Sequence, residues 1–380
     1  MKRVVIFGAT GSIGNSTLAV IRRFPDDFRV VGLSGHCRHD LLQKQVREFR
    51  PEAVAFSGPA PESGFQAPGA RVLTGPGGLD QLADWPGVDL FVLAIPGSDA
   101  LPIALRILES GRPLALASKE AMVMAGELLT ATARRRRVRI IPLDSEHNAI
   151  FQILESNPDR PVRRIYLTAS GGPFFRRRRP NVSITEALAH PVWKMGRKVS
   201  IDSATMVNKA LEVIEAHYLF NLPPEKIGVL IHPEVTVHGL VEFEDGFVLA
   251  NLSRPDMRMP IAYGLFWPDP PPDRPAVGPV DLVKLGRLTF HKPSRKQFPA
   301  LSLAYRVLEK GGLWPAAFSV ANETAVAAFL EGRIPFESIV TSIKQTLNRL
   351  DGEITRRPAG LKEITDITER IRGAAVRSEF

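Results

Sequence analysis

The chain has 380 residues, of which 44% are hydrophobic and 23% charged, a composition typical of a globular protein with two or three domains. Its net charge of +9 admits nucleic acid, a membrane surface or an anionic small molecule as partner; we interpret the arginine runs at 134–137 and 176–179 as solvated surface. The single cysteine, Cys37, excludes an internal disulfide, and no apolar run approaches the roughly 20 residues of a membrane span. Since the N-terminus shows no signal-peptide pattern either, we expect a cytoplasmic protein that uses neither a membrane nor nucleic acid.

The first 145 residues alternate between short apolar runs and helical periodicity. A helix is expected over residues 14–24, and strands are expected over residues 4–7, 29–33, 53–56, 90–94, 114–116 and 139–141. Strands that alternate with helices in this way predict an α/β fold with an N-terminal Rossmann-type doubly wound sheet at 1–145.

The pattern changes in the rest of the chain, where we expect a central α+β catalytic domain at 146–267 with a flexible lid at about 182–200. Within it the sequence predicts a strand at 163–169, irregular structure at 171–200, a helix at 203–219, and a hairpin at 229–252 that turns at 244–246. A proline-rich stretch then predicts an extended linker at 268–292, and helical periodicity predicts a C-terminal helical bundle at 293–380.

A glycine-rich loop lies between the first predicted strand and helix, with the sequence GATGSIG. In a dinucleotide site the first glycine makes the tight turn, the second lets the backbone approach the pyrophosphate, and the third packs helix against strand. The candidate cofactor-binding residues are Gly8, Thr10, Gly11, Ser12, Ile13 and Gly14. A plain strand–turn–helix is the weaker alternative, because the loop opens a series of alternating strands and helices.

The end of the second predicted strand indicates which nicotinamide cofactor is bound. An acidic residue there would bind the ribose of NAD, whereas basic residues bind the 2′-phosphate of NADP. The sequence has Gly35, His36 and Arg38 and no acid before Asp40, which favours NADP. The alternative is that His36 and Arg38 are ordinary loop residues.

Acidic residues that could contribute to a metal site occur in two segments. Asp144 and Glu146 follow a predicted strand, and in extended backbone their carboxylates would point the same way, toward a divalent cation. In the second segment, Asn208 and Glu212 share one helical face beside Lys209. Asn208, Lys209 and nearby serines could surround a phosphate while Glu212 completes a metal site, but an exposed polar helix face explains the spacing equally well.

Two further segments have the composition of a substrate site. Ser170 is followed by two glycines, whose flexible backbone could contact an anion. Residues 190–198 combine His190, Trp193 and Met195 in a segment of irregular composition, which suits a lid that excludes water from a site. A lone histidine is more often structural, and a Trp–Met pair is more often part of a core.

Taken together and in this order, the motifs resemble those of the 1-deoxy-D-xylulose 5-phosphate reductoisomerase family. The resemblance extends over nearly the whole chain. It is carried by GATGSIG, Lys119-Glu120, LDSEH, SGGPF, the HPVWKMGRK segment, SIDSATMVNKALE, the block from Ile231 through His238, PDMRMPIAY, and Ala321-Asn322-Glu323.

The resemblance implies an NADPH-dependent oxidoreductase that isomerises and reduces a phosphorylated ketose, with Mg²⁺ or Mn²⁺, as a homodimer. It implies cleavage and re-formation of a carbon–carbon bond, followed by hydride transfer to the resulting aldehyde, giving 2-C-methyl-D-erythritol 4-phosphate for isoprenoid synthesis. The implied metal ligands are Asp144, Glu146 and Glu212. The implied catalytic and substrate-binding residues are Lys119, Ser145, Glu146, Ser170, His190, Trp193, Met195, Ser203, Asn208, Lys209, Glu212 and His238. Ser118, Glu120 and Gly196 are implied on the cofactor side.

The departures from the family pattern lie mainly on the cofactor side. Ser118 stands where the family has asparagine, and the usual Gly-Lys-Asn loop reads Gly35-His36-Cys37-Arg38. These changes leave open an NADP-dependent reductase of another phosphosugar. The glycine loop and the arginine runs leave open a second alternative, a non-enzymatic protein that binds a dinucleotide or nucleic acid.

Overall fold

The computed structural model describes residues 1–58, 65–75, 77–175, 181–190, 192–193, 195–272, 275–354 and 360–376. Its internal contacts divide the chain into two compact units, each assembled from separate stretches of sequence. The first contains Met1–Ala121, Leu129–Asn148 and Asp256–Gly278; the second contains Met122–Leu128, Ala149–Pro255 and Pro279–Phe380. Within the described residues, no helix has both the length and the apolarity needed to cross a membrane.

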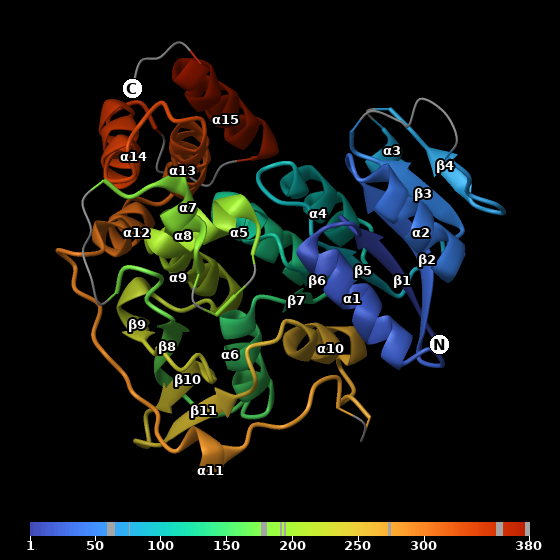
Figure 1. Cartoon of the computed structure of the whole chain (residues 1–380), viewed down its shortest axis with the longest axis horizontal. Coiled ribbons are helices and arrows are strands. Elements are labelled where there is room, and N and C mark those ends of the chain that lie inside the picture. Colours follow the sequence, from blue (N-terminus) through green and yellow to red (C-terminus); the bar gives the residue numbers. More distant parts are fainter. Residues whose placement is uncertain are drawn as a thin grey trace. The chain divides into compact units, whose positions relative to one another are not determined.

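The first unit is built on a parallel sheet of seven strands in the order β4-β3-β2-β1-β5-β6-β7 (Figure 1). The strands are β1 (Lys2–Phe7), β2 (Phe28–Gly35), β3 (Ala53–Phe56), β4 (Arg71–Leu73), β5 (Leu90–Leu93), β6 (Leu114–Leu116) and β7 (Ile140–Pro142). The strand order reverses at β1, which pairs with both β2 and β5. This is the switch point at which doubly wound sheets bind ligands, so the predicted Rossmann-type fold is confirmed and the glycine loop lies at its binding edge.

Helices connect the strands of this sheet: α1 (Ser12–Arg23), α2 (His39–Phe49), α3 (Gly78–Ala83), α4 (Ala100–Glu109), α5 (Lys119–Arg136) and α6 (Ser145–Glu155). A further helix, α10 (Arg258–Phe266), comes from much later in the chain and packs against α1. Lys2 Nζ donates hydrogen bonds to the carbonyls of Leu265, Phe266 and Trp267 at 2.8–3.2 Å. The N-terminal strand therefore caps the end of α10, a long-range contact with no local sequence signal.

The second unit contains a mixed sheet with the order β11-β10-β8-β9. Its strands are β8 (Val162–Ala169), β9 (Ile227–Ile231), β10 (Val237–Phe243) and β11 (Val248–Leu252). The predicted hairpin is confirmed for β10 and β11. It does not begin at residue 229, however, because β9, which follows the single turn η1 (Pro224–Lys226), pairs in parallel with β8 on the opposite side of β10.

The described residues between 171 and 220 contain more helix than the sequence predicted. The segment expected to be irregular contains α7 (Ile184–Leu188), which begins with a capping box of Ser183 and Glu186, and the start of α8 (Arg197–Ala204). The single helix expected over 203–219 is wrong, because α8 ends at Ala204 and α9 (Val207–Phe220) begins separately. Met206, between them, adopts the left-handed conformation with φ of +60° and breaks the helical path.

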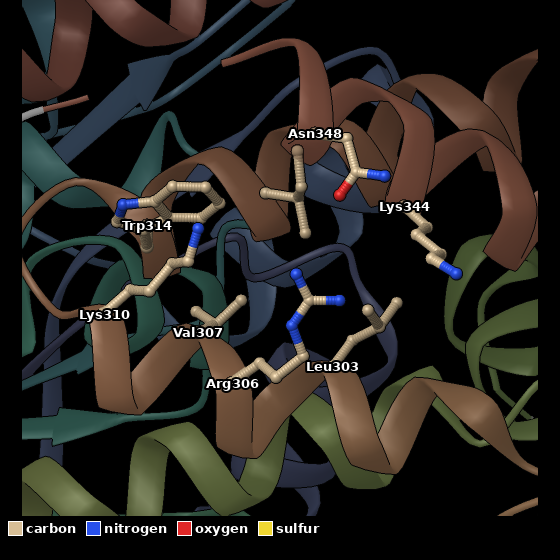
Figure 2. A pocket seen from close by; sticks show the side chains of 8 residues that line it. Leu303, Arg306, Val307, Lys310, Trp314, Lys344 and Asn348 are labelled. Carbon is tan, nitrogen blue, oxygen red and sulfur yellow. The ribbon is translucent and has the colours of Figure 1, made fainter. Parts of the chain in front are cut away.

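The C-terminal part forms the predicted helical bundle, preceded in the proline-rich stretch by the short α11 (Leu282–Leu285). The bundle contains α12 (Pro299–Lys310), α13 (Trp314–Leu330), α14 (Ser338–Arg349) and α15 (Leu361–Val376), and α13 packs against the other three (Figure 1). Figure 2 shows a small pocket between α12 and α14, where Lys310 lies 3.7 Å from the Trp314 ring centre. Lys310 also pairs with Asp351 at 2.7 Å, so this part of the pocket stabilises the bundle.

Two helical glycines make a matched test of the glycine-loop packing. A Cβ on Gly14 in α1 would lie 2.5 Å from the Cα of Ala9, whereas a Cβ on Gly373 in α15 would meet no atom within 4 Å. We expect Gly14→Ala to destabilise the protein by about 1–3 kcal/mol because backbone must move. Gly373→Ala should be neutral or stabilise it by up to about 1 kcal/mol. Urea unfolding measures both, and equal effects of the two substitutions would contradict this account.

Candidate functional site

The glycine loop has the geometry of an anion cradle. Gly8 has a φ of +78°, and a Cβ there would lie 2.5 Å from the Ala94 carbonyl oxygen. The loop leads into α1, whose N-terminus has no side-chain cap and no acidic residue in its first turn. The first amides of α1 and its positive dipole end are therefore available to an anionic ligand such as a pyrophosphate.

The end of β2 brings basic side chains to the same loop. Arg38 Nη1 donates to the Thr10 carbonyl at 3.1 Å, which holds the guanidinium beside the glycine loop. His36 is exposed, and its Nδ1 lies 3.2 Å from Ser57 Oγ. Gly35 is buried in β2, where a Cβ would lie 3.0 Å from the Leu42 side chain, so this glycine serves packing.

Ser118 and Glu120 lie at the start of α5, next to the carboxyl end of the central strands. Ser118 is 4% exposed, and its hydroxyl donates to the carbonyl of Ile95, with the Leu93 carbonyl at 3.3 Å. Glu120, 6% exposed, lies in the first turn of α5, where a negative charge is favoured by the helix dipole.

The acidic pair of the first unit does not lie on a strand as the sequence predicted. β7 ends at Pro142 and α6 begins at Ser145, so Glu146 is in the first turn of a helix. Asp144 caps that helix, because its Oδ1 accepts the Glu146 N–H at 3.3 Å. The helical turn still brings a carboxylate oxygen of Asp144 within 4.8 Å of one of Glu146. The expectation of extended backbone is therefore wrong, but the two carboxylates do lie together.

Cationic and polar groups surround this pair. Lys119 Nζ lies 2.7 Å from Asp144 Oδ2, and both side chains are largely buried. The Ser145 hydroxyl donates to Glu146. His147, fully buried, has Nδ1 3.1 Å from Asp144 Oδ1. The sequence analysis gave His147 no role, although an acid three residues before a histidine at a helix start was the available signal.

In the second unit, the first turns of α9 carry a buried polar cluster. Glu212 accepts hydrogen bonds from the side chains of Asn208 and Lys209. Glu212 is 1% exposed and Lys209 is 3% exposed. This burial contradicts the alternative of an exposed polar helix face, because charged side chains are rarely buried without a partner and a role.

The loop after β8 approaches the turn between α8 and α9. A Cβ on Gly172 would lie 2.9 Å from the Ser203 carbonyl oxygen. Ser203 is the penultimate residue of α8, and Asn208 and Lys209 open α9. The four predicted phosphate ligands, which include Ser170, therefore come from segments that meet at one turn. The N-terminus of α9 also has no acidic residue in its first turn, which suits an anion.

His190 is held in one tautomer by its neighbours. Its Nδ1 accepts the backbone N–H groups of Val192 and Trp193 at 3.2 and 2.8 Å, so the neutral ring carries its proton on Nε2. Nε2 lies 3.0 Å from Ser170 Oγ, which also accepts the Gly172 N–H. Burial lowers the pKa of His190, which favours the neutral ring. With both acceptor positions of Ser170 occupied, its hydroxyl proton is free to donate to a ligand.

The predicted lid contains described and undescribed positions, and Pro191 and Lys194 lie outside the described residues. The Trp193 ring lies 6.5 Å from the ring of His238, which is 4% exposed. Met195 is half-buried, and Gly196, exposed, precedes α8 as its N-cap. Trp193 and His238 are thus the two predicted substrate contacts that the structure brings together here.

A buried network around Asp202 was not predicted. Its carboxylate accepts Lys198 Nζ and Asn322 Nδ2, each at 2.8 Å. Asp202 and Asn322 both stand in motifs singled out in the sequence, but nothing local indicates that residues 120 positions apart form a hydrogen bond.

The predicted site residues are divided between the two units. The glycine loop, Lys119, Asp144 and Glu146 belong to the first, whereas Ser170, His190, Ser203 and the α9 cluster belong to the second. Each unit thus carries its own chemistry: a dinucleotide cradle with paired carboxylates in one, and a phosphate-type site with a buried carboxylate in the other.

Comparisons with known proteins cover nearly the whole chain. Family models of 1-deoxy-D-xylulose 5-phosphate reductoisomerase match residues 4–126, and models of its C-terminal domains match 140–220 and 252–374. The reductoisomerase of Trichlorobacter lovleyi is 46% identical over 96% of this chain and 94% of its own. That of Chlorobaculum tepidum is 44% identical over 91% of this chain and 92% of its own.

Solved structures agree with the sequence relatives. A crystal structure of a reductoisomerase in complex with NADPH, fosmidomycin and magnesium matches with a TM-score of 0.91 and 37% identity, covering 99% of this chain and 98% of that one. The enzyme of Zymomonas mobilis in complex with NADPH matches with a TM-score of 0.87 and 36% identity, with 98% of each chain covered. The chain therefore belongs to the 1-deoxy-D-xylulose 5-phosphate reductoisomerase family.

Proposed function

We infer that the chain is an oxidoreductase that converts 1-deoxy-D-xylulose 5-phosphate to 2-C-methyl-D-erythritol 4-phosphate, with NADPH and a divalent metal ion. The observation that carries this inference is the match to reductoisomerases over 96% of the chain at 46% identity. Related solved structures contain NADPH and magnesium.

The residues of the first unit fit NADPH. The uncapped N-terminus of α1 offers amides to the pyrophosphate, and the φ of Gly8 permits the tight turn that precedes them. Arg38, bonded to the carbonyl of Thr10, carries a fixed positive charge for the 2′-phosphate. We propose that residues 8–14 with Arg38 and His36 hold the cofactor, that Gly35, Ser118 and Glu120 support this end of the site, and that Gly196 lies near the nicotinamide.

The acids fit a hard divalent cation. Carboxylate oxygens are the ligands preferred by Mg²⁺ and Mn²⁺, and the pair Asp144 and Glu146 offers two of them within 4.8 Å. Glu212 offers a third carboxylate whose burial excludes competing water. We propose that these three side chains are the metal ligands, and that His147 orients Asp144 through its ring nitrogen.

The phosphate of the substrate fits the turn formed by Ser170, Ser203, Asn208 and Lys209. Lys209 contributes charge, and the Ser170 hydroxyl contributes a proton directed by His190. We propose that His190, Lys119 and Ser145 contact the carbon chain of the substrate. Trp193, with Met195 and His238, would cover the substrate with an apolar surface that keeps water from it.

The chemistry divides between bound groups and side chains. When bound, the metal ion supplies a Lewis acid and template for the vicinal oxygens of the ketose, and NADPH supplies a hydride. Lys119 holds Asp144 through its ammonium group, 2.7 Å from Oδ2. Burial lowers the pKa of His190, which favours the neutral ring that orients Ser170 by donating from Nε2.

Both alternatives from the sequence are less well supported. A reductase of another phosphosugar is less well supported because the relatives that match over more than nine-tenths of the chain at 44–46% identity are reductoisomerases. Nucleic-acid binding rested on the arginine runs. Arg134–Arg137 are exposed at the C-terminus of α5, where the helix dipole favours cations in any case, and residues 176–179 lie outside the described residues.

We also propose a homodimer that works in the cytoplasm. Val248 and Leu252 are 49% and 37% exposed on β11, an edge strand able to pair with or pack against a second chain. The free Cys37 fits a reducing compartment. Light scattering should give twice the chain mass of 41.8 kDa, and a mass of one chain at micromolar concentration would contradict the dimer.

The activity itself is tested with the purified protein, 1-deoxyxylulose 5-phosphate, Mn²⁺ and NADPH, by the fall in absorbance of the reduced cofactor. Glu212→Gln keeps the shape of the side chain but removes a metal ligand, so kcat should fall by about 100-fold or more. NADPH affinity should be unchanged, because the cradle is in the other unit. Glu331→Gln, at an exposed acid, is the control. No cofactor consumption by the wild type with either Mg²⁺ or Mn²⁺ would refute the function.

The role of Arg38 is tested through cofactor preference. Arg38→Ala should raise KM for NADPH by about tenfold, the value of a charge-assisted hydrogen bond, while leaving KM for NADH unchanged. Arg47→Ala, at an exposed arginine of α2, should change neither constant. Equal changes for both cofactors would assign Arg38 a structural role instead.

A further inference from the structure

The carboxylate of Asp202 is buried between two partners on different helices. Its side chain is 2% exposed, and it accepts Lys198 Nζ, one turn earlier in α8, at 2.8 Å. Its other oxygen accepts Asn322 Nδ2 of α13 at 2.8 Å. Both oxygens are therefore fixed, one by an ammonium group and one by an amide.

Asn322 is a rigid anchor for this interaction. It is fully buried in α13, which packs against α8 as well as against the helices of the bundle. Its Oδ1 has no hydrogen-bond partner among the described residues. Burying an amide with its oxygen unsatisfied costs free energy. Among the described residues, this cost is offset by the bond from Nδ2 to Asp202.

The bond is formed at the residue next to a predicted phosphate ligand. Asp202 directly precedes Ser203, and α8 ends one residue later. The left-handed Met206 then starts α9 with Asn208 and Lys209 in its first turn. A rotation of α8 about its axis would therefore move the Ser203 hydroxyl and shift the start of α9.

The loop that follows Ser170, with Gly171 and Gly172, contacts the same turn between α8 and α9. Because a Cβ on Gly172 would already lie 2.9 Å from the Ser203 carbonyl, the loop and α8 are in close contact. A displacement of α8 would push this loop and with it the Ser170 hydroxyl. The orientation of α8 thus controls groups on all three segments.

We propose that Asp202 is a positioning residue for the substrate phosphate, held by Asn322 and Lys198, and that it sets the orientation of Ser203 and the first turn of α9. This proposal rests on the proposed function, since it concerns the phosphate end of that same site. Asp202 itself repels a phosphate and is buried by its partners, so it acts through α8 and does not bind the phosphate.

A buried ion pair is a costly way to stabilise a protein, which separates this proposal from a purely structural role. Replacing such a pair by apolar groups of similar volume is often neutral or stabilising. Because both carboxylate oxygens of Asp202 are held by hydrogen bonds, they fix the rotation of α8 about its axis more strictly than apolar packing would. The consequence to measure is therefore phosphate recognition rather than thermal stability.

The test compares Asp202→Asn, Asn322→Asp and the double swap with the wild type. Asp202→Asn should raise both KM for 1-deoxyxylulose 5-phosphate and the inhibition constant of inorganic phosphate by about tenfold, with little change in KM for NADPH. Asn322→Asp places a second carboxylate against that of Asp202, so it should raise both constants further. The swap restores one amide and one carboxylate, and should recover at least part of the loss of Asn322→Asp.

Ser319→Ala is the matched control, since Ser319 is equally buried on α13 but forms no bond to Asp202 among the described residues. It should leave all three constants unchanged. If Asp202→Asn changes only the melting temperature, or raises the constants for phosphate and NADPH alike, the proposal is overturned. Failure of the swap to recover any phosphate affinity overturns it too.

Should one variant fail to fold, Lys198→Met removes the other partner of Asp202 and leaves α13 unchanged. This variant should also bind inorganic phosphate about tenfold more weakly. Unchanged phosphate affinity in this variant overturns the proposal. Calorimetric titration of inorganic phosphate needs no turnover. If the wild type binds phosphate but does not consume NADPH, the proposed function is refuted. The effect of Asp202→Asn on the affinity for phosphate then still tests this inference separately.

Discussion

Buried carboxylates are the constraint on which both halves of the site depend. Removing a carboxylate from water costs several kcal/mol unless a cation and hydrogen bonds replace the lost hydration. At three places among the described residues a lysine meets this cost: Lys119 for Asp144, Lys209 for Glu212, and Lys198 for Asp202. In the last two pairs the lysine lies on the same helix as the acid, so the helix itself sets the distance.

These pairs also explain why a basic protein carries an acidic centre. Each lysine–carboxylate pair has no net charge, so the net charge of +9 arises from other residues and does not describe this centre. We propose a second use for Lys209, since an ammonium group beside Glu212 at the start of α9 can also attract a phosphate. The same side chain can thus stabilise the folded site and recognise its substrate.

Local sequence predicted those parts of the molecule whose signals are local. Six of the seven strands of the parallel sheet appear as short apolar runs, whereas the short edge strand β4 was not predicted. The glycine loop follows the first strand because backbone geometry there requires glycine. The break between α8 and α9 was missed because Met206 has no propensity for a φ of +60°, and tertiary packing imposes it. The helix start at Ser145 was missed because Asp144 was treated as a strand residue when it is a cap.

The site was predicted in the same uneven way. Asn208, Lys209 and Glu212 could be grouped because helical spacing alone brings them together, whereas their burial needed the structure. The partnership of Asp202 and Asn322 could not be predicted, since no periodicity links residues 120 positions apart. Function was predictable because several motifs occur in one order, and that order carries more information than any one motif.

The cofactor side shows how a departure from the family pattern can be judged from contacts. Ser118 replaces the usual asparagine, and its one hydroxyl proton is already donated to the carbonyls at the end of β5. An asparagine would have two amide protons to share, but Ser118 can offer a cofactor only its lone pairs. The cofactor carries its distinguishing negative charge on the 2′-phosphate, which needs donors. We therefore propose that recognition of that phosphate falls to Arg38, whose guanidinium is held beside the glycine loop by its bond to Thr10.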